Sequence, residues 1–364
     1  MEAILIFLKD LGWDKSWESI FAPYASRGLK PARVTAVFSH QLEVHSNEGR
    51  HLLARSGKLF YEALHAAQHP AVGDFVAIEG WASGGIMVRE VLSRRSCLSR
   101  QEVGGPEAQV IAANVDVALI IQSLSGDYNL SRAQRYLSMV WEAGITPLII
   151  LSKSDELGSE EAEAKLRLME ANCPGTEVIP ISALTGDGMN ILSRRLLPAK
   201  TFVAMGSSGV GKSTLLNAMM GREIMSTQAV REDDQRGRHT TTHRQMFLLP
   251  QGSVFIDTPG MREFGLFSFG GVSEAFPDVV AVASGCRFRD CRHQDEPGCA
   301  VRGAIATGEL DEKRWSDYVK LQSEEQHFAA KQILLQKKIA NANKKRKKTH
   351  YKDHIRGATR SMSD

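Results

Sequence analysis

A glycine-rich run in the middle of the chain constrains the fold more than any other feature. Gly206–Ser213 spells G-S-S-G-V-G-K-S and fits the pattern G-x-x-x-x-G-K-[ST] in full. The apolar run Thr201–Met205 comes directly before it, and a helical pattern begins at Lys212. Glycines let successive backbone N–H groups point at a phosphate near the positive end of a helix. We therefore expect a nucleoside-triphosphate loop in which Lys212 reaches the β- and γ-phosphates and the Ser213 hydroxyl binds Mg²⁺.

The sequence around this loop alternates between buried strands and helices. Near-continuous apolar runs are typical of parallel strands covered on both faces. The expected strands are Val115–Ile121, Pro147–Leu151, Glu177–Ile181, Thr201–Met205 and Val254–Ile256. The expected helices are Ser131–Ala143, Ser159–Ala171 and Lys212–Met220. This alternation predicts an α/β domain with a doubly wound, mainly parallel sheet.

A region of short β runs lies closer to the N-terminus. Turn clusters separate the five runs Val34–Phe38, Leu42–Val44, His51–Ala54, Phe75–Ile78 and Ile86–Val91. Five short strands in so few residues favour a small closed barrel, most economically an OB-fold. Another small barrel that binds no ligand remains an alternative.

Three cysteines and a histidine follow the α/β region at metal-ligand spacing. Cys286, Cys291, His293 and Cys299 supply three thiolates and one imidazole, a complete tetrahedral set for one structural zinc ion. Their surroundings are turn-forming, so the metal is expected to contribute folding energy. Reactive or disulfide-linked cysteines are the alternative. We expect the chain to divide into a helical extension (1–32), the OB-fold barrel (33–96), the α/β domain (97–270), a mainly helical zinc-binding domain (271–330) and a basic tail (331–364).

The charge is distributed unevenly. Eleven of the 45 Lys/Arg residues but only two of the 42 Asp/Glu residues lie in 331–364, which gives this tail a net charge of +9 and the remainder −6. Such a tail seeks phosphate backbones or anionic membrane, unless it is simply a solvated end. The chain has no apolar run near the ~20 residues of a membrane span, no secretory signal pattern and an odd cysteine count. We expect a cytoplasmic protein with no membrane partner.

The choice of base is predicted by two loops that follow neighbouring strands. The Asp155 carboxylate can accept two hydrogen bonds from guanine, whereas adenine lacks both donors and would leave the charge unpaired. The Lys153 stem can pack on the base plane, and a backbone N–H near Ala183 can donate to guanine O6. Asp257 and Gly260, in the D-x-x-G pattern, are expected to support Mg²⁺ and the γ-phosphate. The residues expected to bind GTP are Ser152, Lys153, Ser154, Asp155, Ser182, Ala183, Gly206, Ser207, Ser208, Gly209, Val210, Gly211, Lys212, Ser213, Thr214, Asp257 and Gly260.

The order of these motifs is permuted. An ordinary GTPase has the phosphate loop first and the base-reading loops last, whereas here 152–155 and 182–184 precede 206–213. Together with Gly237–Thr242 (G-R-H-T-T-T), Asp257–Gly260 and the cysteine cluster, this order resembles the RsgA/YjeQ family of circularly permuted GTPases. The resemblance covers roughly Arg33–Tyr318. It implies a GTP hydrolase that binds the small (30S) ribosomal subunit and its 16S rRNA, assists late maturation, and leaves after ribosome-stimulated hydrolysis. We expect GTP and GDP as ligands and a monomer.

Catalysis is expected to depend on residues on both sides of the D-x-x-G motif, Asp257–Gly260. Many GTPases orient water with a Gln after D-x-x-G, but this chain has Met261 there, so slow intrinsic turnover is expected. His239 is the local candidate to position the water, a role that the resemblance also implies; a solvated loop residue is the alternative. Among Thr240–Thr242 we expect Thr241 to complete the Mg²⁺ shell. A further hypothesis is that residues 261–276 transmit γ-phosphate sensing to the cysteine-rich domain.

Two points keep a second function open. The family's base-reading motif usually begins with Asn or Thr, and Ser152 stands there instead, which is expected to loosen nucleotide affinity. With Met261, this leaves a nucleotide-gated RNA-binding module or chaperone with negligible hydrolysis as the alternative. An ATP-using kinase or helicase conflicts with the Asp155 loop.

Overall fold

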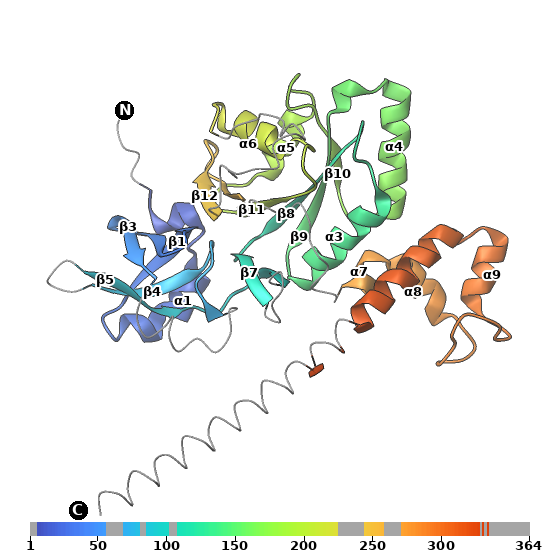
Figure 1. Cartoon of the computed structure of the whole chain (residues 1–364), viewed down its shortest axis with the longest axis horizontal. Coiled ribbons are helices and arrows are strands. Elements are labelled where there is room, and N and C mark those ends of the chain that lie inside the picture. Colours follow the sequence, from blue (N-terminus) through green and yellow to red (C-terminus); the bar gives the residue numbers. More distant parts are fainter. Residues whose placement is uncertain are drawn as a thin grey trace, which may run out of the picture.

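The computed structural model describes residues 6–55, 68–80, 85–101, 108–224, 244–257 and 271–327, with positions 330, 333 and 334. Figure 1 shows three parts: strands β1–β5 at one side, a sheet flanked by helices in the centre, and a helical module at the other side. Within the described ranges, no helix is both long and apolar enough to pass through a bilayer.

The central part is the predicted parallel sheet. The strands β8 (Val117–Ser123), β9 (Thr146–Ser152), β10 (Val178–Pro180), β11 (Thr201–Met205) and β13 (Val254–Asp257) run parallel in the order β10-β9-β8-β11-β13. These strands confirm all five sequence-based assignments to within two residues at either end. An additional antiparallel strand, β12 (Arg244–Leu248), pairs with β13.

Helices cover both faces of this sheet. The apolar residues of α3 (Leu130–Glu142) and α4 (Ser159–Asn172) share one buried cluster with Ala118 and Ile120 of β8. Those of α5 (Met189–Arg195) and α6 (Lys212–Met220) share a second cluster with Leu119 and Ile121. Alternate residues of β8 therefore face opposite helical layers, as the period of a strand requires.

The N-terminal strands form the predicted OB-fold barrel. The strands are β1 (Lys30–Val37), β2 (Gln41–Ser46), β3 (Gly49–Ala54), β4 (Phe75–Gly80) and β5 (Ile86–Val91), in the order β3-β2-β1-β4-β5. Because β1 begins at Lys30, the expected boundary at residues 32 and 33 falls inside this strand. Pro31 does not end the pairing, and lies opposite Ala77.

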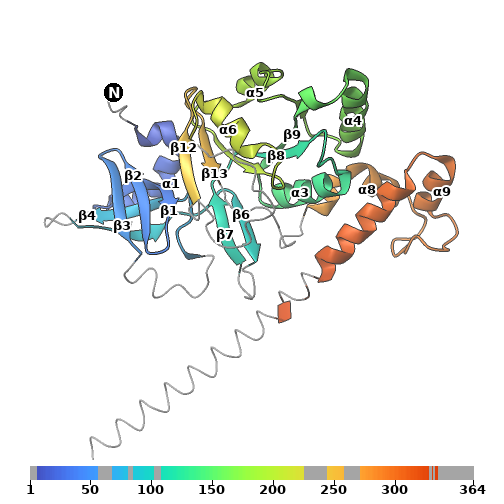
Figure 2. The same cartoon turned by 45° about the horizontal axis from the view of Figure 1, so that its top comes forward.

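The barrel and the central sheet are one hydrogen-bonded surface. Strand β1 pairs antiparallel with β12 at Ala36–Gln245 and Val37–Arg244, which joins eleven strands (Figure 2). A separate hairpin, β6 (Cys97–Gln101) and β7 (Ala108–Ala113), stands beside the junction. The sequence pattern predicted neither the shared sheet nor the hairpin.

The N-terminal extension is helical, as expected, and packs on the barrel. It comprises η1 (Leu8–Leu11) and α1 (Lys15–Ala25), and Trp17 of α1 is buried against Phe75 of β4. The buried Arg33 guanidinium donates to the carbonyls of Leu11, Gly73 and Asn114 and to the Thr201 hydroxyl. Burial lowers the pKa of Arg33 to about 10. One side chain thus connects the extension, the barrel and the sheet.

The C-terminal module is helical and lies against α3. It comprises α7 (Val272–Ala275), α8 (Pro277–Ser284), α9 (Ala300–Thr307) and helical residues 312–327, here called the C-terminal segment. Residues of α7, α8 and α9 share the buried cluster of α3. A Cβ at Gly271 would lie 2.5 Å from the Ser138 carbonyl oxygen, so the backbone before α7 packs directly against the backbone of α3. Residues 312–327 are helical, as expected for a mainly helical domain, and the basic tail (331–364) lies almost wholly outside the described residues.

Candidate nucleotide site and metal centre

The predicted nucleotide residues meet at one edge of the sheet. The phosphate loop follows β11, the base-reading loop follows β9, the Ser182–Ala183 loop follows β10, and Asp257 is the last residue of β13. These strands are parallel, so their carboxyl ends lie together. Strand order reverses between β8 and β11, which is where ligands bind in open α/β sheets. The described loops that the sequence predicts to bind the nucleotide therefore lie together at this edge.

The phosphate loop takes its shape from close backbone contact with the sheet. Gly206 has φ 153°, and a Cβ there would lie 2.4 Å from the Ile121 carbonyl oxygen at the end of β8. Gly209 and Gly211 have φ values of 79° and 94°, in the left-handed region that glycine tolerates. Lys212 Nζ donates to the carbonyls of Gly206, at 2.7 Å, and Ser207. The ammonium group therefore lies within the loop, and Ser213 and Thr214 begin α6 beside it.

Ser152 braces the phosphate loop directly. Its Oγ lies 2.6 Å from the Val210 carbonyl oxygen and 3.2 Å from that of Gln122, and the residue is buried. One hydroxyl proton can serve one of these acceptors at a time, and Val210 is the closer. This hydrogen bond connects the base-reading loop to the phosphate loop, and the looser nucleotide affinity expected for serine stays a prediction.

The two base-reading loops are tied to each other. Ser154 N–H donates to the Ile181 carbonyl at 3.1 Å, and the buried Ser182 Oγ accepts from Thr185 N–H at 3.0 Å. Lys153 is held at φ 59°, a left-handed conformation that is uncommon for a residue with a side chain. The Asp155 side chain remains exposed. A carboxylate in this position is open to a base that enters from solvent.

Several predicted residues lie outside the described part of the chain. They are His239, Thr240, Thr241, Thr242, Gly260 and Met261, together with most of the proposed transmitting segment 261–276. Their roles stay predictions. In turn, the structure adds a residue that no motif indicated: Arg132 of α3 donates from Nη1 to Ser207 Oγ at 2.7 Å. It lies 75 residues from Ser207 and carries no sequence signal of this contact.

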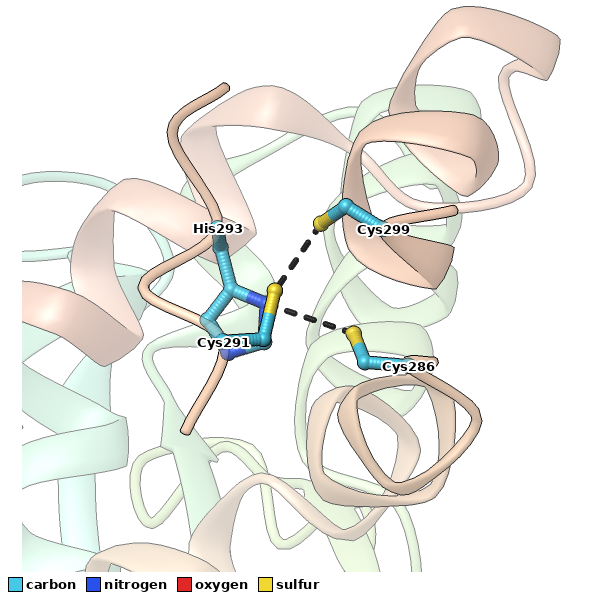
Figure 3. Close-up of side chains that lie close together, drawn as sticks. All are labelled: Cys286, Cys291, His293 and Cys299. Atoms are coloured by element: carbon cyan, nitrogen blue, oxygen red, sulfur yellow. Dashed lines mark hydrogen bonds between the residues drawn. The ribbon is translucent and has the colours of Figure 1, made fainter. Parts of the chain in front are cut away.

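The three cysteines and the histidine converge on one point (Figure 3). Their ligand atoms all lie within 4.8 Å of one another. His293 Nδ1 is 3.5 Å from Cys286 Sγ and 3.6 Å from Cys299 Sγ. Ligands about 2.0–2.3 Å from a tetrahedral zinc ion are separated by roughly 3.5–3.8 Å, so the spacing and the soft donors fit such an ion. Cys286 follows the end of α8, Cys291 and His293 lie in the next turns, and Cys299 is the N-cap of α9.

Local electrostatics distinguish two of the thiols. Desolvation raises the pKa of Cys286, but the backbone N–H groups of Val301 and Ala300 favour its thiolate and bring the net pKa below its ordinary value. Desolvation and the neighbouring thiols raise the pKa of Cys291 to about 11. The ring of Trp315, on the C-terminal segment, meets the His293 ring edge-on at 5.1 Å. A cation at the centre would favour thiolates at every cysteine position.

Comparisons with known proteins agree with this geometry. The sequence profile of the family described as RsgA GTPase matches residues 91–267. A protein of Opitutus terrae named small ribosomal subunit biogenesis GTPase RsgA is 41% identical over 339 residues, covering 90% of this chain and 91% of the relative. A protein of the same name from Streptomyces coelicolor is 41% identical over 327 residues, covering 89% and 88%.

Solved structures show the same architecture. The crystal structure of YjeQ from Thermotoga maritima superposes with a TM-score of 0.62 at 26% identity, covering 82% of this chain and 98% of that one. YloQ, described as a circularly permuted GTPase, has a TM-score of 0.58 at 22% identity, covering 82% and 96%. With the permuted order of its nucleotide loops and its extensive identity to these relatives, the chain belongs to the RsgA GTPase family.

Proposed function

We propose that this protein is a GTP hydrolase that binds the small (30S) ribosomal subunit and its 16S rRNA and assists late maturation. The subunit stimulates hydrolysis, and hydrolysis drives release of the protein from the subunit. The observation that carries the proposal is the meeting of three loops at one sheet edge: the braced phosphate loop, the exposed Asp155 and the tied Ser182 loop. The relatives' printed name, small ribosomal subunit biogenesis GTPase, supports the choice of partner.

In this proposal, GTP is held by the residues of the three loops. The Gly206–Thr214 backbone and Lys212 bind the phosphates, Asp155 accepts from guanine, and Ser213 holds Mg²⁺. Thr241 completes the Mg²⁺ shell, and His239 positions the attacking water. Mg²⁺ neutralises charge that develops on the phosphates during hydrolysis. The side chains of this protein orient the nucleotide and the attacking water.

The Cys/His cluster is proposed to hold one structural zinc ion. Three soft thiol donors and an imidazole Nδ1 converge with tetrahedral spacing, which is the chemistry that zinc prefers. Since the four residues fill all four positions, the ion supplies folding energy rather than an open catalytic position.

Positive side chains around the cluster suit an RNA partner. Four arginines of this region, Arg287, Arg289, Arg292 and Arg302, are exposed beside the half-exposed ring of Phe288. Cations neutralise phosphates, and exposed rings stack on bases. With the OB-fold barrel and the basic tail, they provide several surfaces for one large polyanion. We propose a monomer that acts in the cytoplasm.

The test is GTP turnover by the purified chain with and without small ribosomal subunits, with ATP and large subunits as controls. The proposal expects strong stimulation by small subunits alone, and loss of that stimulation in a His239→Ala variant. Slow turnover that is indifferent to subunits, with GTP-dependent RNA binding retained, would instead support a nucleotide-gated RNA-binding module or chaperone. The observation that favours this second function is Met261, which stands where many GTPases have the glutamine that orients water.

A further inference from the structure

Arg132 connects helix α3 to the phosphate loop. Its Nη1 donates to Ser207 Oγ at 2.7 Å, while its Nη2 donates to the Asp127 carboxylate at 2.6 Å and the Asp127 carbonyl at 3.0 Å. The Asp127 contacts hold the planar guanidinium group in one orientation. The carbonyl of the same Ser207 accepts from Lys212. Arg132 and Lys212, the lysine predicted to reach the phosphates, therefore both bind Ser207.

The first turns of α3 also hold the C-terminal segment. Ser131 Oγ donates to the Asp317 carboxylate at 3.0 Å, and Arg135 Nη2 donates to the Glu324 carboxylate at 3.2 Å. These two contacts flank Arg132 in sequence. Between α3 and the segment lies a cavity of about 390 Å³. Arg132 and Arg135 of α3 and Asp317 of the segment line this cavity.

The N-terminal part of the C-terminal segment also contacts the Cys/His cluster. Trp315 meets the His293 ring, only two residues before Asp317. Arg314 anchors the segment to Asp278 of α8 and to the carbonyl of Asn172, the last residue of α4. A continuous set of contacts thus runs from the cluster, through the C-terminal segment and α3, to Ser207.

We propose that Arg132 is a positioning residue for the phosphate loop, and that through it the docking of the C-terminal segment on α3 tunes the residence time of the nucleotide. The proposal rests on the GTP-binding function proposed above. It is separate from any transmission through residues 261–276, because it uses α3 and not the switch segment. Coupling between two sites is reciprocal, so bound nucleotide also stabilises the docked segment.

The first test compares Arg132→Gln, Ser207→Ala and the double variant in the full-length protein. The probes are N-methylanthraniloyl GDP and GTP, and the measured quantity is their dissociation rate. Each single variant is expected to accelerate dissociation about tenfold, the equivalent of about 1.4 kcal/mol. The double variant is expected to be no faster than either single one, since both remove the same hydrogen bond. Arg167→Gln, which breaks an exposed Arg–Glu pair on α4, is the matched control and is expected to match wild type.

The second test cuts the contacts of the C-terminal segment without touching the phosphate loop. Ser131→Ala combined with Glu324→Gln is expected to accelerate nucleotide dissociation about threefold in the wild-type background, the equivalent of about 0.7 kcal/mol. In the Arg132→Gln background the same pair of changes is expected to have no effect. A purely structural role for these contacts would give the same effect in both backgrounds.

The outcomes separate this inference from the proposed function. Nucleotide dissociation in Arg132→Gln equal to that of Arg167→Gln would overturn the inference, as would additive effects of Arg132→Gln and Ser207→Ala. If wild type binds neither fluorescent nucleotide, the proposed function itself fails. Far-UV circular dichroism and urea unfolding of every variant check folding. If Arg132→Gln does not fold, Ser207→Ala and the Ser131/Glu324 variant still decide the matter by their own dissociation rates.

Discussion

The phosphate loop and the Cys/His cluster reach their shapes by different means. The phosphate loop is pressed against the sheet: Gly206 touches the Ile121 carbonyl, and Ser152 braces Val210. The cluster instead lies on residues 286–299, all of which the structure describes, and these form turns and bends without a helix or strand. Most of their side chains are exposed. The first site is shaped by backbone packing, and the second has four side-chain ligands but little core around it.

This difference has a thermodynamic meaning. A loop held by sheet contacts is preorganised, so the binding energy of its ligand is not used to order the chain. A segment that buries little apolar surface must obtain its ordering energy from its ligand. The two sites of one protein are therefore expected to respond in opposite ways when their ligands are withdrawn.

Metal removal should have the largest effect. Structural zinc supplies about 10–16 kcal/mol of apparent binding energy in small metal-dependent folds. After chelation by 1,10-phenanthroline, trypsin is expected to cut rapidly at exposed Arg287, Arg289 or Arg292 while the central sheet stays resistant. Mass spectrometry of the fragments locates the cuts.

Two cysteine variants sharpen this first comparison. Cys291→Ser is expected to reproduce the sensitivity to trypsin without a chelator, whereas Cys97→Ser, on the hairpin strand β6, is expected to behave as wild type. Resistance of the 286–299 region in metal-free protein would mean that its packing alone orders it.

Gly206→Ala should have the next largest effect, on nucleotide binding. The added Cβ would lie 2.4 Å from a backbone carbonyl, and overpacking of this kind costs about 1–3 kcal/mol. We expect GDP affinity to fall by up to about a hundredfold, measured by titration with a fluorescent analogue. Gly158→Ala, at the N-cap of α4 with φ −66° and open space around it, is the control and is expected to bind normally.

Arg314→Met tests how the cluster module is attached. The buried guanidinium holds the Asp278 carboxylate and the Asn172 carbonyl, so its loss leaves groups without partners. Since Asp278 is half-exposed, we expect a loss of about 2 kcal/mol in the free energy of unfolding. Urea unfolding measures it, with exposed Arg167→Met as the control. An unchanged midpoint would show that apolar packing alone holds the module.

The pH dependence of stability provides a second check of the Arg314–Asp278 ion pair. Burial raises the pKa of Asp278, but the hydrogen bonds and charge of Arg314 lower it by more, so the net pKa lies below its ordinary value. A carboxyl group with a lowered folded-state pKa stabilises the fold above its unfolded pKa of about 3.9, and that stability is lost as the pH falls. The effect of Arg314→Met is therefore expected in full at pH 7 and to shrink below about pH 4.

Ser152→Ala should have the smallest effect. It removes one hydrogen bond to the Val210 carbonyl, worth about 0.5–1.5 kcal/mol, so GDP affinity is expected to fall about fivefold. Ser152→Asn, which restores the family's usual residue, is expected to bind at least as well as wild type. Isothermal titration of both variants with GDP measures the change. An unaltered affinity in Ser152→Ala would mean that sheet contact alone shapes the loop.

Much of the architecture could be predicted because its signals are local. The strand Thr201–Met205 and the helix Lys212–Met220 were predicted with their observed bounds, since a buried apolar run and a glycine loop mark both boundaries. The Cys/His set could be predicted for the same reason, because four potential metal ligands within fourteen residues are held close together by the chain. The strand β12 is not predicted, because Arg244–Leu248 alternates weakly and one of its two partner strands, β1, lies more than 200 residues away in sequence.

What the sequence alone determined is the set of side chains offered by each site: a phosphate-loop pattern, a carboxylate at Asp155 predicted to read guanine, a Cys/His set that could hold a metal ion, and their permuted order. Only the tertiary structure decided how the parts are joined. The pairing of β1 with β12, the contact of the buried Arg33 with Thr201, and the contact of Arg132 with Ser207 each connect residues 75 to more than 200 positions apart. Such contacts leave no periodic signal, because burial and hydrogen-bond partners are settled only when the whole chain has folded.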